Sequence, residues 1–167
     1  MKSLFIAASA AGALLAAAPA FAQTVPFNQF YGTLGYNNYG VDNGPDISAI
    51  TGRLGYRPMP YLGVEGEVST GLSSDHRVGL NDQYAGYAVG YVPVGPNVDV
   101  LARIGYGHSD FHTPTGGFGA DSLNYGVGGQ YFFDHHNGLR VDYTRENYEC
   151  SGCSSADVWS VAYVRKF

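Results

Sequence analysis

The chain has 167 residues, a formal net charge of −5, only 14% charged residues, 24 glycines and 14 tyrosines. This composition argues against a nucleic-acid partner, because no basic stripe is present to neutralise phosphates. Beyond the N-terminal apolar run, no stretch is long and apolar enough to span a bilayer as a helix, so any membrane span has to consist of strands in a closed barrel.

The N-terminal segment has the pattern of a secretory signal peptide. Lys2 precedes an apolar run over residues 4–18, which ends at Pro19 and is followed by a small-x-small site. The alternative is a transmembrane anchor, but the run is shorter than the roughly 20 residues that a spanning helix needs. We therefore predict a signal peptide over residues 1–22 and one barrel domain over residues 23–167.

Eight segments with period-2 alternation follow, and stretches rich in turn residues separate them. Such alternation is typical of strands with two different faces, and eight strands is the smallest common membrane barrel. Short and long connections alternate, as periplasmic turns and outer loops do in such barrels. The sequence predicts an all-β, eight-stranded antiparallel up-and-down transmembrane barrel with both termini in the periplasm. The segments are residues 30–37, 47–57, 61–70, 84–92, 98–107, 122–133, 138–146 and 157–167.

The third segment shows how sharply the pattern sets the two faces. Val64 and Val68 alternate with Glu65 and Glu67, so one face is apolar and the other charged. A lipid-facing charge near the midplane costs on the order of 2–4 kcal/mol, so a slip of one residue is strongly disfavoured. We expect the valines to face lipid and the glutamates to face the lumen.

Tyrosines near segment ends are expected on the outer face, where amphipathic rings suit the headgroup boundary. The alternative is that tyrosine is simply a good strand former. The six that we assign to this position are Tyr36, Tyr56, Tyr91, Tyr106, Tyr131 and Tyr143.

The last segment alternates in the manner of a closing barrel strand and stops on a phenylalanine. Trp159, Val161, Tyr163 and Phe167 share the face expected to contact lipid. We predict that Tyr163 and Phe167 form a C-terminal assembly signal.

Cys150 and Cys153 lie in the last long connection and form a CxxC motif. The motif is compatible with a local disulfide, half of a metal site or redox-active thiols. We expect the disulfide, because a secreted chain meets an oxidising compartment and no strand-to-helix context for a redox motif surrounds the pair.

The run 55–65 (GYRPMPYLGVE), the run 139–143 (LRVDY) and the terminal phenylalanine resemble the eight-stranded barrel of outer-membrane protein A and its small porin-like and opacity relatives. The resemblance covers nearly the whole chain after residue 22. It implies an interior cluster of acidic and basic side chains that plugs the lumen. By motif position its members here are Glu65, Arg103, Arg140 and Asp142.

Three positions depart from the pattern of that family. Ala88 and Gln130 stand where the best-known relative has an interior lysine and glutamate, and Arg165 takes the usual aromatic place two residues before the end. A looser interior at the first two positions would favour a narrow porin.

A physical interpretation of the interior agrees, because side chains about fill the lumen of an eight-stranded barrel. Buried charges are tolerated when they are paired and hydrogen-bonded, so we expect the lumen charges to pair across the barrel in a structural role. The expected members are Arg53, Arg57, Glu65, Glu67, Arg103, Arg140 and Asp142.

The five histidines show no metal-ligand spacing, and we expect no metal and no cofactor. His108-Ser109-Asp110 is the one local candidate for a hydrolase. Adjacent strand residues point to opposite faces, so His108 and Ser109 would be separated unless the chain turns there.

Three functions follow from these patterns. The leading prediction is a non-enzymatic outer-membrane barrel of a Gram-negative bacterium that stabilises the envelope or presents loops for adhesion. The second is a narrow porin for ions or small solutes, and the third is a lipid-modifying hydrolase. The expected partners are outer-membrane lipids and lipopolysaccharide, the assembly machinery and periplasmic chaperones, and a host or surface ligand at the long loops.

Overall fold

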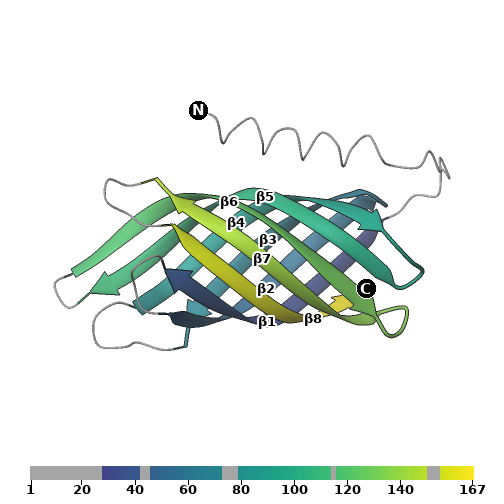
Figure 1. Ribbon diagram of the computed structural model, residues 1–167, viewed down its shortest axis with the longest axis horizontal. Coiled ribbons are helices and arrows are strands. Elements are labelled where there is room, and N and C mark those ends of the chain that lie inside the picture. Colours follow the sequence, from purple (N-terminus) through teal and green to yellow (C-terminus); the bar gives the residue numbers. More distant parts are fainter. Residues whose placement is uncertain (1–27, 42–45, 73–78, 114–115, 150–154) are drawn as a thin grey trace.

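The computed structural model of the chain describes residues 28–41, 46–72, 79–113, 116–149 and 155–167. Eight antiparallel strands pair in chain order, and the last pairs with the first to close a barrel (Figure 1). The predicted all-β up-and-down barrel is confirmed. No helix within these residues has the length and apolarity to cross a membrane. The strands are β1 (Gln29–Val41), β2 (Ile47–Met59), β3 (Leu62–Gly71), β4 (Gly79–Pro93), β5 (Val98–Thr113), β6 (Gly116–Phe132), β7 (Asn137–Tyr148) and β8 (Ala156–Lys166).

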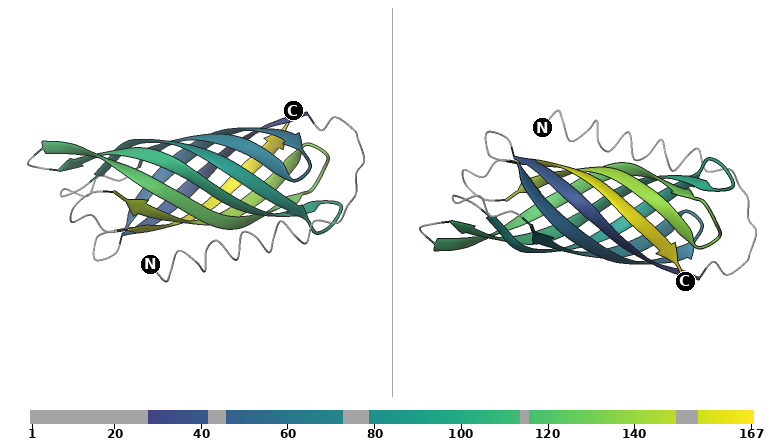
Figure 2. Two further views of the ribbon diagram at one scale, coloured as in Figure 1. Left: turned by 90° about the horizontal axis from the view of Figure 1, so that it is seen from above. Right: turned by 90° about the horizontal axis from the view of Figure 1, so that it is seen from below.

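The two ends of the barrel differ, and we call them the turn end and the loop end. At the turn end three short connections join the strands, at residues 60–61, 94–97 and 133–136, and the chain finishes there at Phe167 (Figure 2). The backbone N–H of Phe167 donates to the Phe30 carbonyl at 2.9 Å, which ties the C-terminus to the start of β1. The loop end carries the other four connections.

The third short turn is ordered by one carboxylate. Asp134 accepts hydrogen bonds from the side-chain amide of Asn137 and from the backbone N–H groups of His136 and Asn137. These donors favour the charged form and lower the pKa of Asp134 to about 2.

The strands continue further toward the loop end than the alternation predicted. Residues 108–121 were expected to form a long connection, but β5 and β6 pair as far as Thr113 and Gly116. This hairpin projects beyond the other strands in Figure 1. A ladder needs only backbone groups, so a segment with many polar residues and glycines can extend it where no apolar surroundings impose alternation.

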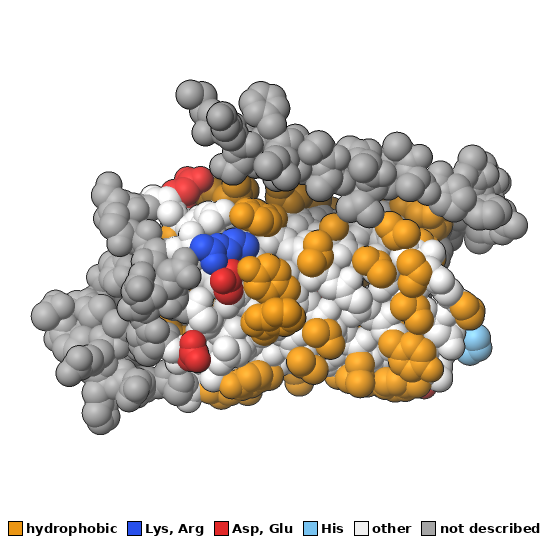
Figure 3. All heavy atoms as spheres, viewed as in Figure 1, with side chains coloured by type: hydrophobic (Ala, Val, Ile, Leu, Met, Phe, Trp, Pro, Cys, Tyr) orange, Lys and Arg blue, Asp and Glu red, His pale blue; other side chains and the backbone are white. Residues whose placement is uncertain are grey.

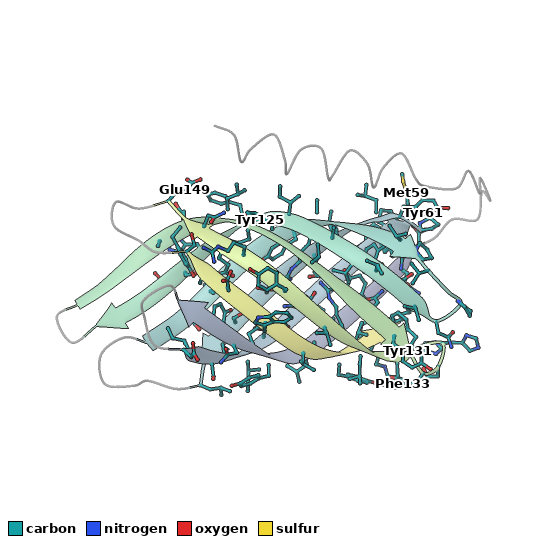
Figure 4. All side chains as sticks on the ribbon, viewed as in Figure 1. Met59, Tyr61, Tyr125, Tyr131, Phe133 and Glu149 are labelled. Atoms are coloured by element: carbon teal, nitrogen blue, oxygen red, sulfur yellow. The ribbon has the colours of Figure 1, made fainter. Side chains whose placement is uncertain are left out.

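The outer face is apolar over the middle of the barrel, and most of the charged side chains visible on it gather toward the loop end (Figure 3). Val64 and Val68 point outward and Glu65 and Glu67 inward, as predicted. In Figure 4, the rings of Tyr61, Tyr131 and Phe133 lie around the turn end, and Tyr125 lies nearer the loop end. Other large apolar side chains of this face include Leu34, Leu54, Ile104, Val127, Val141, Trp159 and Val161.

Five of the six tyrosines assigned to the outer face lie there. Tyr56 and Tyr143 are half-buried because their rings pack against Phe30 and Trp159. The assignment of Tyr91 was wrong, because its side chain points into the lumen and is 3% exposed. The others are Tyr36, Tyr106 and Tyr131.

The lumen is filled in layers. Toward the turn end lies an aromatic and aliphatic cluster that includes Tyr31, Tyr91 and Phe132, and near the loop end Tyr39 and Ile47 belong to a second one. Charged and polar side chains occupy the interior between these clusters.

Candidate functional site

Six charged side chains meet in the middle of the lumen, and we call them the charged cluster. Three arginines face three carboxylates, so the formal charges cancel, and every member is at most 4% exposed. The members are Arg53 on β2, Glu65 and Glu67 on β3, Arg103 on β5, and Arg140 and Asp142 on β7. The structure thus brings together six of the seven residues that the sequence analysis expected to pair in the lumen, and the seventh, Arg57, forms a separate pair.

One ion pair spans the full width of the lumen. Arg140 Nη1 lies 2.6 Å from Glu65 Oε2, and both side chains are fully buried. Their strands β7 and β3 are four positions apart around a closed ring of eight, which makes them diametrically opposite. The pair therefore bridges the lumen from wall to wall.

The remaining ion pairs connect this bridge to the neighbouring wall. Arg53 contacts Glu67 at 2.5 Å and Asp142 at 3.0 Å. Arg103 reaches the same Glu67 oxygen at 2.9 Å, and Arg140 Nε contacts Asp142 at 2.6 Å. Each arginine thus faces at least two carboxylates, which offsets the large cost of removing the charges from water.

Neutral groups satisfy much of the remaining hydrogen-bonding capacity. The Tyr31 hydroxyl donates to Glu65 at 2.8 Å, and Arg103 Nη2 donates to the Thr144 hydroxyl at 2.6 Å. The Arg103 guanidinium also lies 4.4 Å from the centre of the Tyr87 ring, within cation–π range. Such saturation is what a buried ionic network needs in order to be stable.

Inward-facing glycines make room for the charged cluster. Gly128 lies opposite Asp142 on the β6–β7 ladder, and Gly126 lies opposite Arg103 on the β5–β6 ladder. A Cβ at Gly128 would be 2.6 Å from the Val141 carbonyl oxygen. A glycine paired with a large charged residue is the signal by which this packing could have been predicted.

Arg57 belongs to a separate ion pair nearer the turn end. Its Nη1 contacts Asp99 at 3.0 Å, and Gln130 donates to the same Asp99 oxygen at 2.8 Å. The Arg57 guanidinium lies 4.1 Å from the centre of the Tyr91 ring. Gln130 is uncharged and stabilises the buried Asp99 carboxylate by donating a hydrogen bond to it.

The comparison of Ala88 with an interior lysine was wrong, because Ala88 is exposed on the outer face. The inward positions beside it are Tyr87 and Val89. Its identity therefore does not loosen the lumen.

The hydrolase candidate is not assembled. His108 is exposed on the outer face, whereas Ser109 points inward and is fully buried. The ring nitrogens of His108 contact Asp121 at 2.6 Å and Asp110 at 3.5 Å, so both of these partners are acids. The separation expected for adjacent strand residues is what the structure shows.

Two further predictions concern the CxxC motif and the C-terminus. Cys150 and Cys153 lie outside the described residues. Tyr163 and Phe167 both point outward, and the Tyr163 hydroxyl donates to the Asn137 side chain.

Residues 8–167 match the model of the family described as outer membrane protein beta-barrel domain. The chain belongs to this family. It is therefore an outer-membrane β-barrel protein of the Gram-negative envelope, and the apolar outer face is the surface that meets lipid. No curated protein matches the chain.

Solved structures of small outer-membrane barrels share the fold. One is Ail, the attachment invasion locus protein of Yersinia pestis, which was solved in complex with the heparin analogue sucrose octasulfate. Its TM-score is 0.62 at 16% sequence identity, and the match covers 84% of this chain and 99% of that chain. The N-terminal barrel domain of Pseudomonas aeruginosa OprF has a TM-score of 0.62 at 13% identity, covering 82% of this chain and 97% of that one. For OprG of the same organism the TM-score is 0.59 at 12% identity, covering 84% and 96%.

Proposed function

We propose that this protein is a non-enzymatic barrel with a sealed lumen, which stabilises the envelope and acts on its surroundings through its loop end. The wall-to-wall contact between Glu65 and Arg140 carries the proposal. A permeating ion would have to separate two buried opposite charges that are 2.6 Å apart, and it would meet Arg53 and Arg103 beside them. Separating a buried ion pair is strongly unfavourable.

The shape of the loop end supports a role in surface interaction. The β5–β6 hairpin is formed by the two longest strands and projects beyond the rest of the barrel (Figure 1). A rigid barrel that holds projecting segments is a common arrangement for binding proteins. The partners that we propose are a host or environmental surface ligand at this end and lipopolysaccharide around it.

The short connections at the turn end support an orientation of the barrel in which this end faces the periplasm. Short turns face the periplasm in barrels of this architecture, so both termini would lie there, with residues 1–22 removed as a signal peptide. An outward-facing Tyr163 and Phe167 at this end suit recognition by the assembly machinery and periplasmic chaperones. An epitope inserted in the 94–97 turn should be protected in intact cells, and exposure of that epitope would contradict this orientation.

Single-channel recording in a planar bilayer tests the sealed lumen. The refolded wild-type barrel is expected to give no discrete conductance steps. Reproducible steps would contradict the proposal and favour the second candidate, a narrow porin. The first residues to change would then be Glu65, Arg103, Gln130 and Arg140.

A further inference from the structure

A further buried carboxylate lies on the loop side of the charged cluster, outside the ion pairs of that cluster. Glu146 is four residues beyond Asp142 on β7 and is 1% exposed. Its two oxygens accept hydrogen bonds from Gln83 Nε2 and the Tyr148 hydroxyl, each at 2.8 Å. Within the part of the chain that the structure describes, no arginine, lysine or histidine nitrogen is within ion-pair distance of it. Such a charge is costly unless it is paired, neutralised or bound to a cation.

The wall beside Glu146 presents further oxygens without donors. Asn124 lies directly opposite Glu146 on the β6–β7 ladder, and the Cβ atoms of such a pair are about 4.5–5.5 Å apart. Asn124 Nδ2 donates to the Tyr87 hydroxyl at 3.1 Å, so the free end of the amide is its carbonyl oxygen. That oxygen is fully buried and has no hydrogen-bond partner among the described residues. On the same inner face of β6, the fully buried Ser122 hydroxyl likewise has no hydrogen-bond partner within the ranges that the structure covers.

This arrangement has the chemistry of a cation site. A carboxylate, an amide carbonyl and a hydroxyl offer only hard oxygen ligands, and carbonyl oxygens can replace the hydration shell of an ion such as K⁺. One carboxylate is balanced by one positive charge, whereas a divalent ion would leave the buried site with a net charge. We propose that Glu146, Asn124 and Ser122 bind a small monovalent cation in the loop-side half of the lumen.

The cation dependence of stability tests this site. A cation that binds only the folded barrel raises the unfolding midpoint, and the increase grows with cation concentration. In an uncharged detergent, the urea midpoint of the wild type should be higher in NaCl or KCl than in choline chloride at equal ionic strength, because choline is too large for the site. Equal midpoints in all three salts would overturn the proposal. They would mean that Glu146 is protonated or that the Asn124 amide is turned over to donate to it.

Two variants and a matched control locate the effect. Glu146→Gln should lose the difference between the salts, whereas Glu149→Gln removes an exposed carboxylate near the end of the same strand and should keep it. Retention of the difference in Glu146→Gln would overturn the site. Asn124→Ala keeps the charge and should raise the half-saturating cation concentration several-fold, and an unchanged value would exclude the carbonyl ligand.

A direct readout covers the case in which Glu146→Gln does not fold. Thallium-205 NMR of the wild-type barrel should show saturable Tl⁺ binding that K⁺ displaces, and absence of such binding would overturn the proposal. The outcome is independent of whether the charged cluster seals the lumen, which the planar-bilayer recording decides.

Discussion

At the scale of single residues, the charged cluster works because its charges are shared. The Glu65 carboxylate lies 2.6 Å from the Arg140 guanidinium and 3.4 Å from that of Arg103. It also accepts a hydrogen bond from the Tyr31 hydroxyl. Removing one partner of a buried network leaves an uncompensated charge, which costs far more than the net contribution of the network when intact. Loss of the charged cluster should therefore change both the free energy of unfolding and the ion conductance of the lumen.

Glu65→Ala is the corresponding prediction. It leaves three arginines facing two carboxylates. We expect the free energy of unfolding to fall by about 3–5 kcal/mol. If the barrel still folds, water should enter to solvate the uncompensated charge and ions should leak through the lumen. Urea titration and planar-bilayer conductance measure the two effects. Glu149→Ala, at an exposed carboxylate, is the control and should change neither quantity. An unchanged stability together with an unchanged conductance would rule out the pairing.

At the scale of the elements, the strand glycines differ in how much space surrounds them on the two faces of the barrel. Inward glycines such as Gly128 lie against the neighbouring strand and the charged cluster, whereas outward Gly66 has no atom within 4 Å of the position of a Cβ. The same residue type therefore serves close packing on one face and leaves open space on the other. The two faces should respond differently to an added methyl group.

Gly128→Ala and Gly66→Ala form a matched pair. The first forces a Cβ to within 2.6 Å of the Val141 carbonyl, and we expect a loss of roughly 1–3 kcal/mol of stability from overpacking. The second should be neutral or slightly stabilising, because alanine loses less backbone entropy on folding. Both are measured by urea unfolding, and equal losses in the two variants would show that the glycines do not act through lumen packing.

At the scale of the whole molecule, the barrel is inverted relative to a water-soluble protein. Its outer band is apolar, with Val127 and Ile104 each 57% exposed, and its interior is charged. A lipid environment is the one in which this arrangement is stable, because the outer side chains need no water and the backbone groups pair within the closed sheet.

Val127→Arg tests this inversion. In lipid vesicles a charge in the middle of the outer band should cost about 2–4 kcal/mol. Val94→Arg introduces the same side chain in an exposed turn outside the band and should cost little. Equal effects of the two substitutions on the unfolding midpoint in vesicles would mean that the band is not in lipid.

The sequence predicted the fold well where charges alternate with apolar residues and poorly where they do not. On β3, Glu65 and Glu67 set the phase of the strand without ambiguity. On β4, both faces are uncharged from Tyr84 to Val92, and the errors at Ala88 and Tyr91 amount to the same one-residue slip in phase. The extent of the β5–β6 hairpin was missed because strands outside the lipid need no regular pattern.

The sequence by itself determined the number of strands, the inverted distribution of polarity and seven of the charges that enter the lumen, from Arg53 to Asp142. These properties are local, since alternation along one strand is enough to assign its faces. Only the tertiary structure decided that Arg140 meets Glu65 from the opposite wall, that Arg57 pairs with Asp99, and that Glu146 accepts hydrogen bonds from Gln83 and Tyr148 outside the charged cluster. Those pairings depend on barrel closure and on the stagger of the strands, which bring together residues that no local pattern relates: Arg57 and Asp99 are 42 positions apart, and Glu65 and Arg140 are 75 apart.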